Sequence, residues 1–245
     1  MSVVALIVAA GRGSRAGEGV PKQYRSLNGQ TVLKRTLDCF LAHPRVDYVI
    51  AVIHPDDEAL YSKAIGSADS DPQLLPAAYG GKTRQDSVRN GLEALSDVKA
   101  NLVLVHDAAR PFVNAELIDR AIDAATAWGA AVPGIPVTDT IKVLGDQDMV
   151  AATPDRASLR AVQTPQAFRF TELLEAHRKA ADTGLHAFTD DGALAEWAGL
   201  PVHVFTGEAS NIKLTHPSDF AEAEQRLKGS RMTYVTRVGT GFDVH

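Results

Sequence analysis

The sequence predicts an α/β fold in which a mostly parallel central sheet carries helices on both faces. Apolar runs alternate with segments of helical periodicity, and such alternation implies right-handed strand–helix–strand crossovers. The first run, residues 3–10, is apolar throughout, as expected for a strand that is buried on both faces. The chain of 245 residues has room for one large α/β domain or two small ones.

The same two patterns predict the remaining elements in order along the chain. Residues 31–42 place Leu33, Leu37 and Phe40 on one helical face, and residues 46–53 read as a strand. The last helix, residues 217–227, begins with proline, which a first helical turn tolerates. We expect further helices at residues 87–98, 116–128, 171–181 and 190–198, and further strands at residues 102–105, 130–137 and 202–205.

Residues 139–170 interrupt this alternation. Two β-rich stretches, residues 140–144 and 149–153, flank a Gly-Asp-Gln-Asp turn and predict a hairpin that protrudes as an arm from the α/β body. An isolated two-stranded hairpin is marginally stable in water. We therefore expect the arm to pack on something else, such as a second subunit.

Composition excludes several classes of function. A net charge of −5 and 45% apolar residues describe an ordinary globular enzyme without an overall basic field for nucleic acid. Cys39 is the single cysteine, which we interpret as a small apolar side chain rather than a reactive thiol. The N-terminus lacks the features of a signal peptide, a transit peptide or a membrane span, so we expect a bacterial, cytoplasmic protein that does not bind membranes.

The loop that follows the first strand is the strongest local signal of function. It contains four glycines, among them Gly11 and Gly13, and the cations Arg12, Arg15 and Lys22. Glycines let the backbone N–H groups approach a phosphate closely, and the cations add positive charge. The loop therefore predicts a triphosphate site.

Two other interpretations of this loop are weaker. Gly11-x-Gly13-x-x-Ala16 fits a relaxed dinucleotide-binding fingerprint, but the second strand ends in His54-Pro55-Asp56 rather than in the expected acidic residue. A merely tight turn would not explain three cations in one loop. No Walker motif is in register.

Two further segments predict parts of the same site. The strand at residues 102–105 delivers His106 and Asp107 to its C-terminal end, where open α/β sheets bind ligands. Asp107 is a candidate Mg²⁺ ligand, with a simple turn cap as the alternative, and His106 is given no role. Gly80 and Gly81 precede a helix, so they indicate either a base-binding backbone or an ordinary helix cap.

The motifs taken together resemble one family. They occur in the order Ala9-Ala10-Gly11-x-Gly13-x-Arg15, Pro21-Lys22-Gln23, Gly80-Gly81-x-x-Arg84-x-x-Ser87-Val88, His106-Asp107-Ala108-Ala109-Arg110-Pro111, Asp139-Thr140-x-Lys142, Thr164-Pro165-Gln166, Thr189-Asp190-Asp191 and Asn211-Ile212-Lys213. This set resembles the 2-C-methyl-D-erythritol 4-phosphate cytidylyltransferases over about residues 2–228. The resemblance implies a Rossmann-like nucleotidyltransferase fold and the transfer of CMP from CTP to the polyol phosphate in non-mevalonate isoprenoid biosynthesis.

The resemblance also implies roles for individual residues. Gly11, Gly13, Arg15 and Lys22 would cradle the CTP triphosphate, while Ala9, Ala10, Gly81, Lys82 and Ser87 would border the cytosine and ribose. Asp107 would hold Mg²⁺ or another divalent cation, with Ala108 and Arg110 nearby. Thr140, Arg156, Thr164, Thr189 and Lys213 would surround the polyol phosphate, and Arg15, Lys22 and Lys213 would be catalytic. The family is homodimeric through its arm, which would bring Arg156 towards the partner's site. Ser210 departs from the aspartate that is frequent before the Asn-Ile-Lys motif, which puts one polyol contact in doubt.

The tail carries a second resemblance. Residues 237–245 are similar to the opening of the 2-C-methyl-D-erythritol 2,4-cyclodiphosphate synthases, in which the counterparts of Asp243 and His245 bind zinc. We therefore expect a cytidylyltransferase domain at residues 1–228, a linker at 229–236 and the truncated start of a second domain. A zinc site would need that second domain, because one segment cannot close it. An arbitrary tail is the alternative.

Three other functions share parts of this pattern. A cytidylyltransferase for another polyol phosphate, such as ribitol 5-phosphate, would differ around residues 140–213. A non-catalytic nucleotide sensor would not need Arg15, Lys22 and Asp107 together. An NAD(P)-binding oxidoreductase would use the glycine-rich loop for a dinucleotide.

Overall fold

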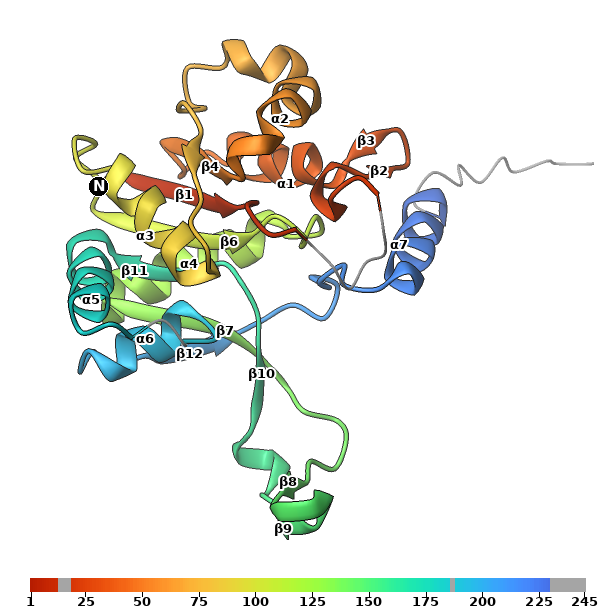
Figure 1. Cartoon of the computed structure of the whole chain (residues 1–245), viewed down its shortest axis with the longest axis vertical. Coiled ribbons are helices and arrows are strands. Elements are labelled where there is room, and N and C mark those ends of the chain that lie inside the picture. Colours follow the sequence, from red (N-terminus) through yellow and green to blue (C-terminus); the bar gives the residue numbers. More distant parts are fainter. Residues whose placement is uncertain (13–18, 186–187, 230–245) are drawn as a thin grey trace, which may run out of the picture.

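The computed structural model describes residues 1–12, 19–185 and 188–229. Eight of the described strands form one sheet in the order β10-β7-β11-β6-β1-β4-β5, and β12 pairs with β7 as well. Figure 1 shows this sheet at the centre of the molecule, surrounded by helices. The predicted α/β fold with a mostly parallel sheet is confirmed, since four of its strand pairs are parallel: β1–β4, β1–β6, β4–β5 and β7–β12.

The parallel half of the sheet is built around β1 (Val3–Val8). β4 (Tyr48–Ile53) and β6 (Leu102–Asp107) flank it, and β5 (Ala78–Tyr79) extends the sheet beyond β4. Because β1 has a strand on each side and helices on both faces, every position from Val3 to Ile7 is buried. This placement explains why the first apolar run shows no alternation.

The other half of the sheet contains the predicted strands at residues 130–137 and 202–205, together with two strands that sequence patterning missed, residues 160–162 and 166–169. β11 (Gln166–Arg169) runs antiparallel between β6 and β7 (Ala130–Pro136). β10 (Arg160–Val162) pairs antiparallel with the end of β7, and β12 (His203–Thr206) lies parallel to β7. Short strands like β10 and β11 carry too few residues for a period to be recognised.

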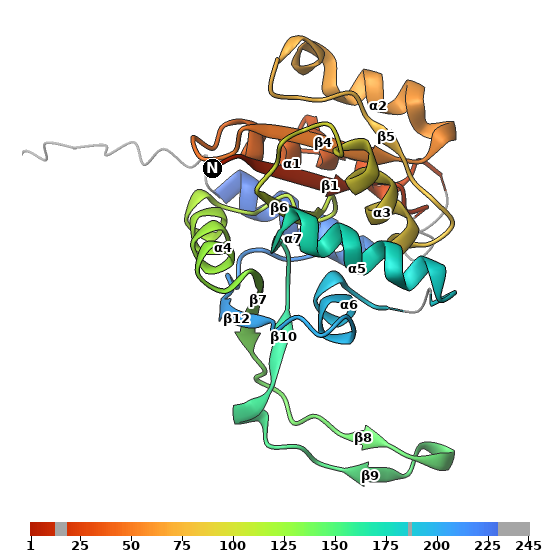
Figure 2. The same ribbon diagram turned by 90° about the vertical axis from the view of Figure 1, so that its left-hand side faces the viewer.

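Alternate residues of β1 face two different helical layers. Val3, Ala5 and Ile7 pack with α1 (Val32–Leu41), α2 (Glu58–Ile65) and α4 (Ala115–Trp128). Val4 and Leu6 pack with α3 (Arg84–Ala94), α5 (Phe170–Asp182) and α6 (Asp191–Trp197). Figure 2 shows α4 on one side of the sheet and α3, α5 and α6 on the other. The period of two in a strand produces this division.

A third, smaller cluster joins the last described helix to the body. α7 (Pro217–Gly229) contributes Ala223, which packs with Leu214 and with Leu27 of the hairpin formed by β2 (Ser26–Leu27) and β3 (Gln30–Thr31). The tail motif with Asp243 and His245, and the expected second domain, lie outside the described residues. Among the described helices, none has the length and apolar character needed to cross a membrane.

The arm contains the predicted hairpin, formed by β8 (Val143–Leu144) and β9 (Val150–Ala152). It projects away from the sheet and the helices in both views (Figures 1 and 2). The protruding part is shorter than the expected 139–170 segment, because Gln166 and Phe168 are buried in the main sheet as part of β11. Every residue from 138 to 153 is exposed.

Cys39 lies on α1 and is half-buried. Its Sγ donates to the Arg35 carbonyl at 3.3 Å, and burial raises the pKa of the thiol to about 11. A thiol that stays protonated at neutral pH is a poor nucleophile. The structure thus agrees with the interpretation of Cys39 as a small apolar side chain.

Candidate active site

The carboxyl ends of β1, β4 and β6 meet at one edge of the sheet and border a cavity of about 430 Å³. Open α/β sheets bind ligands at this edge because loops, rather than strands, surround it. Most of the residues that line the cavity come from the glycine-rich loop, the start of α3 and the end of β6. The full lining is Val8, Ala9, Ala10, Gly11, Arg12, Lys22, Gln23, His54, Gly81, Lys82, Thr83, Arg84, Ser87, Asp107, Ala108, Ala109 and Lys213.

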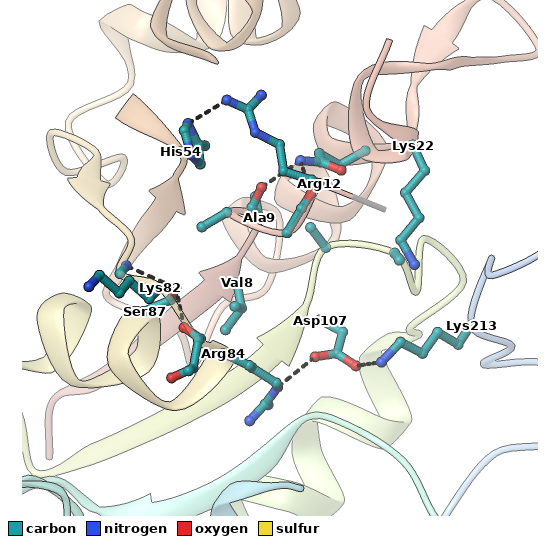
Figure 3. A pocket seen from close by; sticks show the side chains of 17 residues that line it. Val8, Ala9, Arg12, Lys22, His54, Lys82, Arg84, Ser87, Asp107 and Lys213 are labelled. Carbon is teal, nitrogen blue, oxygen red and sulfur yellow. Dashed lines mark hydrogen bonds and ion pairs between the residues drawn. The ribbon is translucent and has the colours of Figure 1, made fainter. Parts of the chain in front are cut away.

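Asp107 ends β6 and is the one carboxylate among the described residues that line this cavity. Its Oδ2 lies 2.7 Å from the Lys213 Nζ, and its Oδ1 lies 3.3 Å from the Arg84 Nε (Figure 3). Burial alone would raise the Asp107 pKa, but Arg84, Lys213 and Arg110 outweigh it and hold this pKa below its ordinary value. The carboxylate is therefore ionised at neutral pH and surrounded by cations.

Arg84 is a part of the site that sequence reasoning missed. It is the first residue of α3, whose start is fixed by a capping box between Thr83 and Asp86. Its guanidinium contacts Asp107 through Nε and Asp191 through Nη1, the latter at 2.8 Å. An arginine that opens a helix three residues after a glycine pair was the available signal, and it became informative only beside Asp107.

A second cavity of about 230 Å³ adjoins the first. It is lined by Arg84, Asp107, Arg110, Val162, Gln163, Thr164, Gln166, Thr189, Asp190 and Lys213. Arg84, Asp107 and Lys213 line both cavities, so they form a common wall. The structure thereby brings together three of the residues expected near the polyol phosphate: Thr164, Thr189 and Lys213.

The other two residues expected near the polyol phosphate lie elsewhere. Thr140 and Arg156 belong to the arm, are exposed, and line neither cavity. The Arg156 Nη1 donates to the Thr138 carbonyl at 3.0 Å, within the arm itself. Within one copy of the chain, these two side chains are therefore not part of the site.

The described part of the glycine-rich loop is held by a buried glutamine. The Gln23 Nε2 donates to the carbonyls of Ala9, at 2.6 Å, and of Gly11, at 3.0 Å. The neighbouring Lys22 extends its Nζ to the Leu214 carbonyl at 3.0 Å, next to Lys213. Gly13 and Arg15 lie outside the described residues.

Arg12 behaves differently from the other cations of this region. Its guanidinium donates to Asp56 at 2.7 Å, to Asp57 at 2.8 Å and to His54 Nδ1 at 2.8 Å. Figure 3 shows the side chain turned towards His54, away from Asp107. The positive charge of Arg12 is thus already matched by carboxylates of the turn that follows β4.

The glycine pair before α3 is required by close packing. A Cβ on Gly80 would lie 2.3 Å from the Ala10 Cβ, and one on Gly81 would lie 2.4 Å from the Asp86 Cβ. The Gly81 N–H donates to the Ser87 Oγ at 3.1 Å, and Ser87 donates to the Thr83 carbonyl at 2.8 Å. The segment is therefore a helix cap and also a wall of the larger cavity, so its two interpretations are compatible.

His106 holds Thr164 in place. Its Nε2 donates to the Arg110 carbonyl at 3.1 Å, so its Nδ1 accepts from the Thr164 hydroxyl at 3.0 Å. Burial lowers the pKa of His106 to about 4, which keeps the ring neutral in this role. Thr164 also accepts from the Asp107 N–H at 3.1 Å, so its hydroxyl links the end of β6 to the segment between β10 and β11.

A divalent cation in the larger cavity would find one carboxylate among the described lining residues, that of Asp107. Groups of three or more acidic, histidine or cysteine side chains that could enclose a metal are absent from the described residues. Mg²⁺ takes one or two carboxylates together with water and substrate phosphates, so the single ionised carboxylate of Asp107 fits such an ion. To bind it, Asp107 would have to exchange its contact with Lys213.

Known proteins resemble this chain along most of its length. The sequence model of the 2-C-methyl-D-erythritol 4-phosphate cytidylyltransferase (IspD) family matches residues 3–229. A protein of Rhodopseudomonas palustris named bifunctional enzyme IspD/IspF is 56% identical over 98% of this chain. A protein of the same name from Nitrobacter winogradskyi is 54% identical over the same share. The chain spans 59% of the length of each of these curated relatives.

Solved structures resemble it as well. The 4-diphosphocytidyl-2C-methyl-D-erythritol synthase of Anaerococcus prevotii has a TM-score of 0.82 and 33% identity, and the match covers 93% of this chain and 98% of that one. The 2-C-methyl-D-erythritol 4-phosphate cytidylyltransferase of Thermus thermophilus has a TM-score of 0.74 and 37% identity, over 93% of this chain and all of that one. The expected fold and family are both confirmed.

Proposed function

This chain belongs to the 2-C-methyl-D-erythritol 4-phosphate cytidylyltransferase family, and we propose that it transfers CMP from CTP to 2-C-methyl-D-erythritol 4-phosphate. Pyrophosphate leaves, and the CDP-methylerythritol product serves non-mevalonate isoprenoid biosynthesis. The observation that carries the proposal is the wall of Arg84, Asp107 and Lys213 that two adjacent cavities share. Ligands bound in the two cavities would lie next to each other at this shared wall, so a group could pass from one ligand to the other.

The larger cavity is the proposed CTP site. Ala9, Ala10, Gly81, Lys82 and Ser87 border the nucleoside, and Gly11, Gly13, Arg15 and Lys22 hold the triphosphate, with Ala108 and Arg110 nearby. Of these, Gly13 and Arg15 lie outside the described residues, Arg110 lines the smaller cavity, and the others line the larger one. The spread of these residues over three loops explains why no single motif defines the site.

The smaller cavity is the proposed polyol phosphate site. Thr164, Thr189 and Lys213 line it, and Arg110 adds positive charge. The substrate phosphate is an anion at neutral pH and needs no general base to become a nucleophile. The obstacle is instead the repulsion between this phosphate and a polyanionic triphosphate, so catalysis consists of positioning and charge neutralisation.

We propose an in-line attack of the polyol phosphate on the α-phosphorus of CTP. Lys22 and Arg15 stabilise the charge that develops on the α-phosphate and on the leaving pyrophosphate. Lys213, on the common wall, holds the attacking phosphate and releases Asp107 as it does so. Asp107 would hold Mg²⁺, which would supply positive charge against the phosphates.

We also propose that two chains form a homodimer through their arms. Several large apolar side chains of the arm are exposed, among them Leu144, Met149 and Val150. An exposed apolar patch of this kind is typical of an interface. In such a dimer, Thr140 and Arg156 of one chain would reach the polyol phosphate site of the other.

The whole protein is proposed to be longer and bifunctional. Its curated relatives named above carry the name IspD/IspF and extend well beyond the length of this chain. The zinc-type motif at Asp243 and His245 would then belong to a second domain. The relatives come from bacteria, and we propose that the enzyme works in the bacterial cytoplasm.

Pyrophosphate release tests this proposal. The protein is incubated with CTP and Mg²⁺ together with methylerythritol 4-phosphate, with ribitol 5-phosphate or with no acceptor. Release with methylerythritol 4-phosphate alone is expected. Release with ribitol 5-phosphate alone would keep the reaction and overturn the acceptor, and CTP binding without release would point to a nucleotide sensor.

A further inference from the structure

A buried chain of polar side chains lies behind the common wall of the two cavities. Asp191, the first residue of α6, accepts from the Arg84 Nη1 at 2.8 Å and from the His177 Nε2 at 3.1 Å. The side chains of Asp191 and His177 are 2% and 0% exposed, and neither residue lines either cavity. The side chains of these two residues therefore act on the site through Arg84, the cavity-lining residue that the Asp191 carboxylate contacts.

The donor and the acceptor of each hydrogen bond between these buried side chains can be assigned. Burial by itself would raise the Asp191 pKa, but Arg84 and His177 lower it, so the carboxylate is ionised and can only accept. The His177 Nε2 therefore carries a proton and donates it. The His177 Nδ1 is buried and has no hydrogen-bond partner among the described residues. The contact with Asp191 is thus the one polar contact described for this ring.

The backbone of Asp191 is also held firmly. The Gln166 Oε1 on β11 accepts from the N–H groups of Asp191 at 3.0 Å and Gly192 at 3.1 Å. The same Gln166 donates from Nε2 to the Asp190 carboxylate at 2.8 Å. Main chain and side chain of Asp191 are therefore both fixed, which makes it a rigid anchor for the guanidinium of Arg84.

Fold stability is a poor explanation for this arrangement. Transferring a charge into the interior costs several kcal/mol per ion, and apolar residues of similar volume commonly stabilise a fold as well or better. The planar guanidinium of Arg84 is instead held at two nitrogens, Nε by Asp107 and Nη1 by Asp191. Two contacts define both its position and its tilt. The described contacts of Arg84 do not use Nη2.

We propose that Asp191 and His177 are positioning residues that fix Arg84 on the wall shared by the two cavities, so that its guanidinium meets the phosphates as they approach each other. This inference rests on the proposed function. Without Asp191, Asp107 would be the one described carboxylate left to hold Arg84, and the guanidinium would be free to rotate about that contact. Misplacement of a reacting group by about 1 Å can cost about a hundredfold in rate.

Three variants test the proposal through steady-state kinetics. Asp191→Asn keeps the shape but loses the charge, and we expect kcat to fall about 10- to 100-fold with the KM for CTP changed less than about threefold. His177→Leu, which removes the donor, should lower kcat about tenfold. His177→Gln, which can donate from a similar position, should restore most of that loss.

A matched control separates positioning from general stability. His43 is also a buried histidine beside an aspartate, with its Nε2 3.6 Å from Asp119, but it lies away from both cavities. His43→Leu should lower the melting temperature and leave kcat unchanged. If the Asp191→Asn and His177→Leu variants are folded and keep the wild-type kcat, or change only the melting temperature or the KM for CTP, the proposal is wrong.

The position of Arg84 can also be followed without catalysis. The Nε–H signal of Arg84 in a ¹⁵N-correlated NMR spectrum, identified by its absence from an Arg84→Lys variant, should be sharp in the wild type and shifted or broadened in Asp191→Asn. An unchanged signal would overturn the positioning role. Absence of pyrophosphate release by the wild-type protein would refute the proposed function instead, and the NMR result would still decide the positioning role.

Discussion

The α/β body buries most of its large apolar side chains, whereas the arm exposes several of them. In the body, Leu6 and Phe40 are fully buried between strand and helix layers. In the arm, Leu144 is 56% exposed and Met149 70% exposed, and none of the described helices covers them (Figure 2). A body that buries its own surface is stable alone, whereas an arm without a core depends on another surface for its order. The two regions should therefore respond differently to the same kinds of mutation.

Truncation of a leucine tests this contrast most strongly. Leu6→Ala removes a side chain with no exposed surface and should lower the free energy of unfolding by about 4 kcal/mol, through lost burial and a cavity. Leu144→Ala in the arm should change it by less than about 0.5 kcal/mol in the monomer. Urea denaturation at low protein concentration measures both. Equal losses would mean that the arm contributes to the folding of the body.

Acid should weaken the body through His106. This ring is neutral when folded, with a pKa of about 4, and its ordinary pKa is about 6.5, so between these values the unfolded chain binds the extra proton. Stability should therefore fall as the pH drops from about 6.5 to 4, by on the order of 3 kcal/mol. The loss should be smaller in His106→Gln, which has no such proton to gain. Parallel curves for the two proteins would contradict the prediction.

We expect catalysis to depend on the cations that line the proposed CTP site, not on the surface charge of the body in general. Lys22→Ala removes a cation that lines the proposed CTP site, and kcat should fall about a hundredfold, which corresponds to about 3 kcal/mol of barrier. Lys63→Ala, an exposed lysine on α2, is the control and should leave kcat within about twofold. Pyrophosphate release measures both rates. An unchanged kcat in Lys22→Ala would remove this residue from the proposed mechanism.

The arm should matter for assembly and, through assembly, for activity. Leu144 and Val150 are cross-strand partners, so Leu144→Asp with Val150→Lys replaces an apolar pair by an opposite-charge pair that can keep the hairpin paired. We expect a shift from dimer to monomer in sedimentation and about a tenfold loss of activity at low protein concentration. The melting temperature of the body should stay the same.

Asp148→Ser, in the turn of the hairpin, is the control for this double substitution and should change neither the assembly nor the activity. A double variant that is fully active as a monomer would show that Thr140 and Arg156 are not needed at a partner's site. A double variant that stays dimeric would place the interface elsewhere.

Local patterns were sufficient for the parts of this protein whose signal lies within a short stretch of chain. The apolar run of β1, the helical period of α1 and the glycine-rich loop were all recognised from neighbouring residues. The edge of the sheet at which Asp107 lies could also be predicted, because parallel strands present their carboxyl ends together. The motifs, taken in their order along the chain, also indicated the family.

Contacts between distant residues could not be predicted in this way. Arg12 is 45 residues from Asp57, and Arg84 is 107 residues from Asp191. Whether a cation faces a ligand or a buried carboxylate depends on which strands are neighbours in the sheet. One of these neighbours, the antiparallel strand β11, has no hydrophobic period by which the sequence could predict it. Burial of a charge, its partner and its pKa are properties of the packed chain. Only the folded structure decided that Arg84 contacts Asp107, while Arg12, which lines the same cavity, pairs with Asp56 and Asp57.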